Sequence, residues 1–160
     1  MSHRAIVVWT RRGLLLAALG ALFLSLRRYS IYRIPGPDAS MDPLYPGGAR
    51  VLVEAIEPRD PLERGTDVVY AWEQHGATHA RFGRVGGLPG DVVGADAGLL
   101  TANGQATQLR GEPMGTVPPG FVLVPNLNPR ERTYPDSRTL GFIARARIRF
   151  RIRTTIGMPW

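Results

Sequence analysis

The longest apolar run of the chain lies near its N-terminus. The run, Gly13 to Leu26, reads GLLLAALGALFLSL and carries no charged residue. As an α-helix rising ~1.5 Å per residue it spans about 21 Å, which is shorter than the ~30 Å hydrocarbon core of a bilayer. Arginines flank the run, and their long side chains can reach the bilayer interface: Arg11, Arg12, Arg27 and Arg28. With Ala5–Trp9 as an extension, residues 1–28 are predicted to form a single membrane anchor.

Two other interpretations of this segment stay open. The run has the length of the apolar region in a cleaved secretory signal, but Arg27, Arg28 and Tyr29 follow it in place of a small-x-small cleavage site. The pair Arg11-Arg12 also resembles a twin-arginine export signal, which we attribute to the general richness in arginine. Positive charges slightly favour the N-terminal side of the run once the amino terminus is counted, which predicts a cytoplasmic N-terminus.

Short apolar runs separated by turn residues make up the rest of the chain. The 19 glycines and 14 prolines favour a β-rich domain over a helical one. Two prolines and a glycine in Tyr29–Asp38 predict an irregular linker. Asn103-Gly104 predicts a hairpin, because this pair supplies the two positive φ angles of a type I′ turn. The expected strands are Arg50–Ile56, Asp67–Trp72, His79–Val85, Asp91–Ala95, Leu99–Ala102, Gln105–Gln108 and Phe121–Val124. We therefore predict an all-β domain over residues 39–160, joined by a linker over 29–38 to one transmembrane helix.

The most regular alternation comes near the C-terminus. In Ala144–Arg153, which reads ARARIRFRIR, basic and apolar residues alternate as in a strand with one buried face. The other face is predicted to carry five arginines: Arg145, Arg147, Arg149, Arg151 and Arg153. Like charges ~6.6 Å apart repel one another, so we expect a counter-charge. This face is predicted either to be solvated or to contact anionic lipid or an acidic partner.

Composition narrows the classes of partner and cofactor. The formal net charge is +7, and all 20 basic residues are arginines, because the chain contains no lysine. An excess of positive charge favours binding to nucleic acid, anionic lipid or an acidic protein, and the predicted membrane anchor makes lipid the expected partner. Nucleic acid is not expected, because the predicted arginine face of Ala144–Arg153 carries no aromatic residues to stack on bases. The absence of cysteine excludes disulfides and thiolate metal sites, and His75 and His79 lack a third ligand, so we predict neither metal nor cofactor.

Four motifs follow one another between Asp38 and Phe142. Their sequences are ASMDPL at Ala39–Leu44, RGTDVV at Arg64–Val69, RVGGLPGD at Arg84–Asp91 and DSRTLGF at Asp136–Phe142. The set resembles the type I signal peptidase family in order and spacing. That family has an anchor, a Ser-Met-x-Pro box, an acidic block leading into a strand, a Lys-Arg-x-x-Gly-Leu-Pro-Gly-Asp box, an Asn-Gly hairpin and an Asp-Ser-Arg-x-x-Gly-Phe box. The resemblance implies the β-sheet fold of signal peptidases.

The resemblance also implies a serine–lysine dyad. In the family a serine hydroxyl attacks the peptide carbonyl, and a desolvated lysine amine takes its proton. Ser40 matches the nucleophile. The lysine should directly precede Arg84, but position 83 is a glycine, which has no side chain to accept a proton.

Neighbouring side chains are poor substitutes for this lysine. Arg81 and Arg84 stay protonated, because the pKa of a guanidinium lies above ~12. His79 has suitable chemistry, and eukaryotic-type relatives use histidine, but in a strand it lies about 13 Å from position 83. A bulge could shorten that distance.

Two more family positions depart from the pattern, while others are retained. The family often has a serine donor to the oxyanion two residues before the nucleophile, where this chain has Asp38, whose carboxylate would repel an oxyanion. The serine that helps to orient the lysine is replaced by Tyr134. The resemblance assigns a supporting ion pair to Asp136 and Arg138, and Arg84 lies beside the base position.

These departures predict a membrane-anchored signal-peptidase homologue that has lost peptidase activity. Such a protein would act as a binding or structural subunit, holding an extended peptide or a membrane-protein partner, or joining a larger membrane complex. The alternative is an active signal peptidase that uses Ser40 and a non-standard base. The resemblance places the chain in the bacterial cytoplasmic membrane as a single-pass protein, with its C-terminal domain on the periplasmic side.

Overall fold

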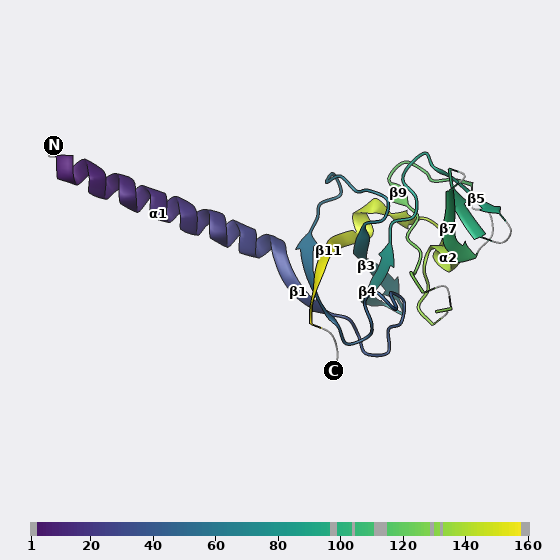
Figure 1. Ribbon diagram of the computed structural model, residues 1–160. Coiled ribbons are helices and arrows are strands. Elements are labelled where there is room, and N and C mark those ends of the chain that lie inside the picture. The colour runs from purple at the N-terminus through teal and green to yellow at the C-terminus, as the bar shows by residue number, and fades with distance from the viewer. Residues whose placement is uncertain are drawn as a thin grey trace.

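Beyond the first helix, the strands of the chain form three β-sheets. The computed structural model describes residues 3–96, 99–103, 105–110, 115–128, 130–131 and 133–157. The largest sheet has five strands in the order β1-β2-β11-β3-β4 (Figure 1). Its strands are β1 (Tyr29–Arg33), β2 (Arg50–Ala55), β3 (Asp67–Gln74), β4 (Ala77–Arg84) and β11 (Ile148–Gly157). The prediction of a mostly β-sheet domain is confirmed.

Two smaller sheets complete the domain. One has four strands in the order β7-β6-β5-β8, and the other pairs β10 with β9. Their strands are β5 (Val92–Asp96), β6 (Leu99–Ala102), β7 (Gln105–Arg110), β8 (Gly115–Thr116), β9 (Phe121–Val122) and β10 (Ile143–Ala144). The predicted Asn-Gly hairpin lies between β6 and β7, where Ala102 pairs with Gln105 and Asn103 has a φ of +52°. Gly104 lies outside the described residues.

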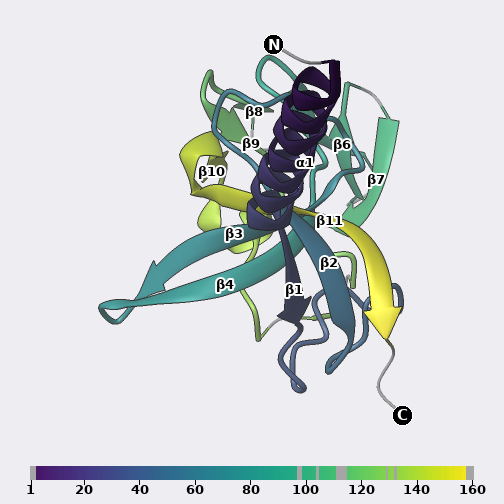
Figure 2. The same cartoon turned by 90° about the vertical axis from the view of Figure 1, so that its left-hand side faces the viewer.

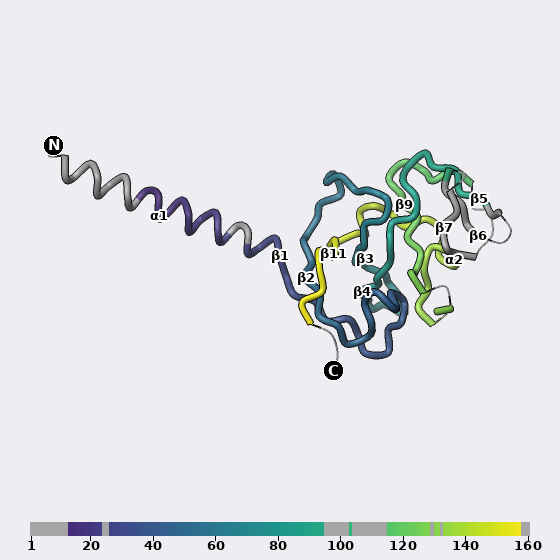
Figure 3. Tube along the Cα trace, viewed as in Figure 1, coloured from purple at the N-terminus to yellow at the C-terminus, as the bar shows by residue number. Residues whose placement is uncertain are grey.

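The first helix, α1 (His3–Arg28), projects from the sheets as a rod (Figures 1 and 3). Residues 13–23 of this helix are exposed along their whole length, with Leu14 at 71% of its full exposure. The run that we predicted to form an anchor therefore lies in a helix that packs on nothing else in the domain over those residues. Among the described residues, no helix meets both the length and the apolarity needed to cross a bilayer.

The prediction of an irregular linker over Tyr29–Asp38 is wrong for its first half. Tyr29–Arg33 forms β1, which pairs antiparallel with β2 and follows α1 without a gap. The two prolines and the glycine of this segment come only after Arg33, so the preceding residues, YSIYR, are free to complete a sheet edge. The helix therefore continues directly into the sheet, as the view along the helix shows (Figure 2).

The five-stranded sheet is covered by apolar clusters on both faces. On one face Val51, Val53 and Phe82 pack with Met41 of the loop between β1 and β2. On the other face the loop after β9 and the segment before β11 add apolar residues to those of β3. This second cluster contains Ile56, Val68, Tyr70, Val85, Val122, Val124, Ile143 and Ile148. Burial of two faces explains why the strands read as short apolar runs rather than as strict alternations.

The predicted arginine strand is wrong in its first half. Ala144 belongs to β10, residues Arg145–Arg147 form a 3₁₀ turn, and β11 begins only at Ile148. A backbone bond from Arg145 N–H to the carbonyl of Gly120, 2.7 Å long, holds the start of that turn. Bulges in β11 further disrupt the alternation, so the five arginines do not form one face.

Four of these arginines have partners within the domain. Arg145 donates to the carbonyls of Glu57 and Asp60 at 2.9 Å each, and the guanidinium of Arg147 lies 5.0 Å from the centre of the Trp72 ring. Arg151 and Arg153 both contact Glu54 of β2. The side chain of Arg149 is exposed. Part of the counter-charge that we expected for the arginines therefore comes from Glu54 within the same domain.

Candidate active site

Ser40 lies in the loop between β1 and β2, which is held from two sides. Asn128 donates its backbone N–H to the Ser40 carbonyl and its side-chain amide to the Ala39 carbonyl, both at 3.0 Å. At the other end of the loop, the Tyr45 hydroxyl donates to Asp67 Oδ2 at 2.9 Å. Met41 between them is fully buried and packs in the first apolar cluster. Ser40 therefore has a fixed position rather than a place on a free loop.

Ser40 is buried, and its hydroxyl is not part of a hydrogen-bond network among the described residues. The residue is only 1% exposed, and its Oγ has no hydrogen-bond partner among the described residues. Its backbone N–H donates to Asp38 Oδ1 at 2.9 Å, and Asp38 is itself 2% exposed. The group that would stabilise an oxyanion is thus bound to a carboxylate of the same loop.

Gly83 is fixed by close packing against a neighbouring segment. In β4 it pairs with Val68, and a Cβ atom at position 83 would lie 2.7 Å from Val124 Cγ1 and 2.9 Å from the Pro125 carbonyl oxygen. Arg84 N–H donates to that same carbonyl at 3.0 Å. Real Cβ atoms do not approach other heavy atoms so closely, so any larger residue here would force Val124 or the Pro125 backbone to move. The space that a lysine side chain would enter is filled by Val124 and Pro125.

The Asp-Ser-Arg motif holds the segment that packs on Gly83. Asp136 caps the short helix α2 (Ser137–Leu140), and its Oδ2 accepts the N–H of Asn126 at 2.6 Å. Ser137 Oγ accepts the N–H of Val124 at 2.8 Å. The Arg138 guanidinium lies 2.8 Å from Asp136 Oδ2, and both side chains are almost fully buried. This motif therefore positions the polypeptide that occupies the base position.

Two further ion pairs join the other motifs. Arg84 donates to both oxygens of Asp67 at 2.6 and 2.9 Å, and the same carboxylate accepts from Tyr45. Burial, with Asp67 beside the hydroxyl, raises the pKa of Tyr45 to about 12. Asp91 closes its turn by accepting the Leu88 N–H at 2.7 Å and pairs with Arg64. The hydrogen bond from Arg64 lowers the pKa of Asp91 to about 2.

The remaining candidate bases are exposed to solvent or have the wrong chemistry. His79 of β4 pairs with Trp72 of β3 and has an exposed side chain, whereas the Ser40 hydroxyl is buried. The Arg81 guanidinium lies over the ring of Tyr134 at 5.1 Å. Tyr134 thus stacks on a permanent cation where the family pattern has a serine that orients lysine. Within the part of the chain that the structure describes, no group of three or more His, Cys, Asp or Glu side chains could hold a metal.

Comparison with known proteins decides the family. A family model described as signal peptidase, peptidase S26, matches residues 8–118, which is more than half of the chain. The chain belongs to the signal peptidase S26 family. No curated protein matches it significantly. The matched region contains Ser40 and Gly83, so these two residues stand within the peptidase domain of this family member.

Sequence reasoning missed the residues that surround the dyad positions in this signal peptidase homologue. Val124 and Pro125 fill the base position, and Asn126 and Asn128 fix the segment and the Ser40 loop. Val124 belonged to a predicted strand, but nothing in the sequence indicates which strand lies against Gly83. Two asparagines after a proline-bounded strand were the only signal, and asparagine is common in any loop.

Proposed function

We propose that this signal peptidase family member is a non-catalytic homologue that acts as a binding or structural subunit. The observation that carries the proposal is the packing at Gly83, where a Cβ would lie 2.7 Å from Val124. A serine hydroxyl needs a positioned base to become a nucleophile, and in this family that base is a lysine at this position. Here the position has neither the side chain nor the room for it.

The environment of Ser40 supports the same proposal. Its hydroxyl is buried and forms no hydrogen bond with a described group, so no base contacts it as the side chains stand. Its N–H is bound to the Asp38 carboxylate, whose negative charge opposes the charge that develops on a tetrahedral intermediate. Base and oxyanion site are therefore both altered, while the ion pairs that build the scaffold are kept.

One observation favours the second candidate, an active signal peptidase with a non-standard base. Asp38 lies within hydrogen-bond distance of the Ser40 backbone, and its Oδ2 has no partner among the described residues. A carboxylate in that place could accept the proton of Ser40 after a side-chain rotation. It would then serve as the base in place of the missing lysine.

We further propose that α1 anchors the protein in the bacterial cytoplasmic membrane, with the β domain on the periplasmic side. The exposed leucines of α1 support this, and Arg27 and Arg28 at its end suit a membrane interface. The anchor brings the domain to the lipid surface, where it would hold an extended peptide segment or a membrane-protein partner without cutting it.

The binding role is tested by what co-purifies with the full-length protein from detergent-solubilised membranes. We expect a discrete complex of fixed stoichiometry, measured by native mass spectrometry. Because the role does not use the hydroxyl, the Ser40→Ala variant should recover the same complex in the same amount. A monomer without bound partner, or a complex that forms only in the Ser40→Ala variant, as trapped substrate would, contradicts the proposal.

A further inference from the structure

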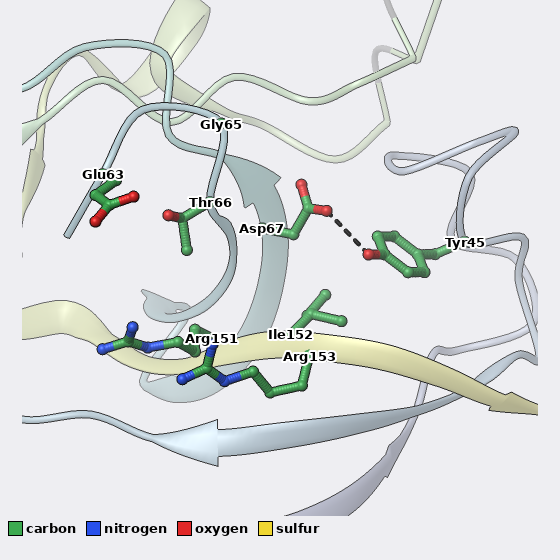
Figure 4. Close-up of a pocket in the computed structure, with 8 residues that line it drawn as sticks. All are labelled: Tyr45, Glu63, Gly65, Thr66, Asp67, Arg151, Ile152 and Arg153. Carbon is green, nitrogen blue, oxygen red and sulfur yellow. Dashed lines mark hydrogen bonds between the residues drawn. The ribbon is translucent and has the colours of Figure 1, made fainter.

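A polar pocket lies where β11 and the start of β3 separate. The two strands pair only as far as Arg151 and Val68, and beyond that point a cavity of about 380 Å³ opens between them. Figure 4 shows the side chains that surround it. They are Tyr45, Glu63, Gly65, Thr66, Asp67, Arg151, Ile152 and Arg153. Ser40, Asp38 and Gly83 do not line this pocket, which adjoins the candidate active site only through Tyr45 and Asp67.

Two guanidinium groups form one wall of the pocket. Arg151 and Arg153 lie along β11, across the pocket from Glu63 and Thr66 (Figure 4). Both contact Glu54: Arg153 Nε donates to its Oε2 at 2.6 Å, and Arg151 Nε lies 3.5 Å from the same oxygen. Arg151 Nε is buried and has no hydrogen-bond partner among the described residues. Arg151 therefore shares the Glu54 carboxylate with Arg153 through its charge and not through a hydrogen bond from Nε.

Positive charge exceeds negative charge around this wall. Glu54 is also bound by Arg28 at 2.7 Å, so three arginines surround one buried carboxylate. Asp60, 3.8 Å from Arg28, can balance the charge of Arg28. Arg151 and Arg153 then share the single negative charge of Glu54. Burial alone raises the pKa of Glu54, but the hydrogen bond and charge of Arg153, with the other arginines, lower it below its usual range.

The two acidic residues that line the pocket, Asp67 and Glu63, differ in how they face the arginines. The carboxylate of Asp67 points away from Arg151 and Arg153 (Figure 4). Both of its oxygens accept from Arg84, and one also accepts from the Tyr45 hydroxyl. Glu63 is exposed on the opposite side. A bound anion would therefore meet two guanidinium groups and the Thr66 side chain, with Glu63 and the shared Glu54 as opposing charges.

We propose that this pocket binds a phosphate group, supplied by the headgroup of an anionic phospholipid. Arginine pairs suit phosphate because each planar guanidinium can donate two parallel hydrogen bonds to its oxygens. Glu54 contacts the two arginines of the pocket and also Arg28, the last residue of α1, so the pocket lies close to the end of this helix. If α1 is the membrane anchor, this end of the domain meets the phosphates of the bilayer surface. The site itself stands without the proposed function, which only supplies the source of the phosphate.

The test uses the full-length protein in neutral detergent micelles. Phosphatidylglycerol, phosphatidylcholine or inorganic phosphate is added, and the ligand-induced shift of the melting temperature gives an apparent affinity. We expect phosphatidylglycerol, but not phosphatidylcholine, to raise the melting temperature in a saturable way. Arg153→Gln should weaken the apparent affinity about tenfold, because it removes a charge-assisted fork of donors. The matched control Arg149→Gln removes an exposed arginine of the same strand and should change the affinity less than about twofold.

A second variant keeps the proposal testable if Arg153→Gln unfolds. Glu63→Gln removes the opposing charge from an exposed side chain, so it should strengthen phosphatidylglycerol binding about two- to threefold. Equal losses in Arg149→Gln and Arg153→Gln, or no effect of Glu63→Gln, would overturn the site. A shift that depends on Arg153 with inorganic phosphate but not with phosphatidylglycerol would support the phosphate site and overturn the lipid source. None of these outcomes depends on whether Ser40 cleaves peptides.

Discussion

Replacing Gly83 with alanine is expected to destabilise the domain by about 1–3 kcal/mol, the usual cost of overpacking a filled site. In most strand interiors the same change is favourable by about 0.5–1 kcal/mol, because glycine loses more conformational entropy on folding. The sign reverses here because the new methyl group would meet Val124 and the Pro125 carbonyl at 2.7 and 2.9 Å. Urea unfolding of the full-length protein in detergent, followed by far-UV circular dichroism, measures the difference.

Gly157 provides the matched control for this prediction. It lies in β11, and a Cβ at its position would meet nothing within 4 Å. Gly157→Ala should therefore leave the unfolding midpoint unchanged or raise it slightly. Equal midpoints for the two variants would contradict the close packing at Gly83.

The same packing predicts the outcome of restoring the family's lysine. Gly83→Lys would have to displace Val124 or Pro125, so the variant should lose stability and gain no peptidase activity. Asp38 would still bind the Ser40 N–H, and Tyr134 would still stack on Arg81.

Replacing Asp136 with asparagine is expected to cost about 3–5 kcal/mol, the range observed when one member of a buried ion pair is removed. The carboxylate of Asp136 lies 2.8 Å from the Arg138 guanidinium and accepts the N–H of Asn126 at 2.6 Å. Asparagine keeps the shape but removes the charge and one acceptor oxygen. The loss should also loosen Val124 and Pro125, which the motif holds against Gly83.

An exposed ion pair serves as the control for Asp136→Asn. Glu57 lies 2.8 Å from Arg59, but both side chains are largely exposed. Glu57→Gln should therefore change the free energy of unfolding by less than about 1 kcal/mol. Chemical denaturation of the two variants side by side separates a buried pair from a solvated one, and equal effects would contradict the role given to Asp136.

The β-sheet fold was predictable because its signals are local. Apolar runs bounded by glycine and proline indicated the strands, and Asn103-Gly104 indicated a hairpin that β6 and β7 form. Strand β1 was not predicted, because Pro35 and Pro37 suggested that the whole of Tyr29–Asp38 is irregular, although its first five residues contain no proline. The 3₁₀ turn at Arg145–Arg147 was missed because it depends on a backbone bond to Gly120, far away in the sequence.

The candidate site was predictable in its residues but not in its contacts. The motif spacing pointed to Ser40, Gly83 and Asp38, yet glycine at position 83 looked like a loss of chemistry alone. Its packing against Val124 and Pro125 comes from a pairing between distant segments, which no local pattern encodes. The arginines of β11 show the same limit, since their partner Glu54 lies in β2.

Ser40-dependent cleavage of a signal-peptide substrate is the most direct measurement of whether this family member is an enzyme. Wild type, Ser40→Ala and, as a control, Ser30→Ala, which removes an exposed serine of β1, are purified as full-length proteins and given the same substrate. Because Ser40 Oγ has no described partner and position 83 has no room for a base, we predict no turnover above the Ser40→Ala level. Turnover by wild type and Ser30→Ala that disappears in Ser40→Ala would contradict the loss of catalysis, and its loss in Asp38→Asn would then identify the base.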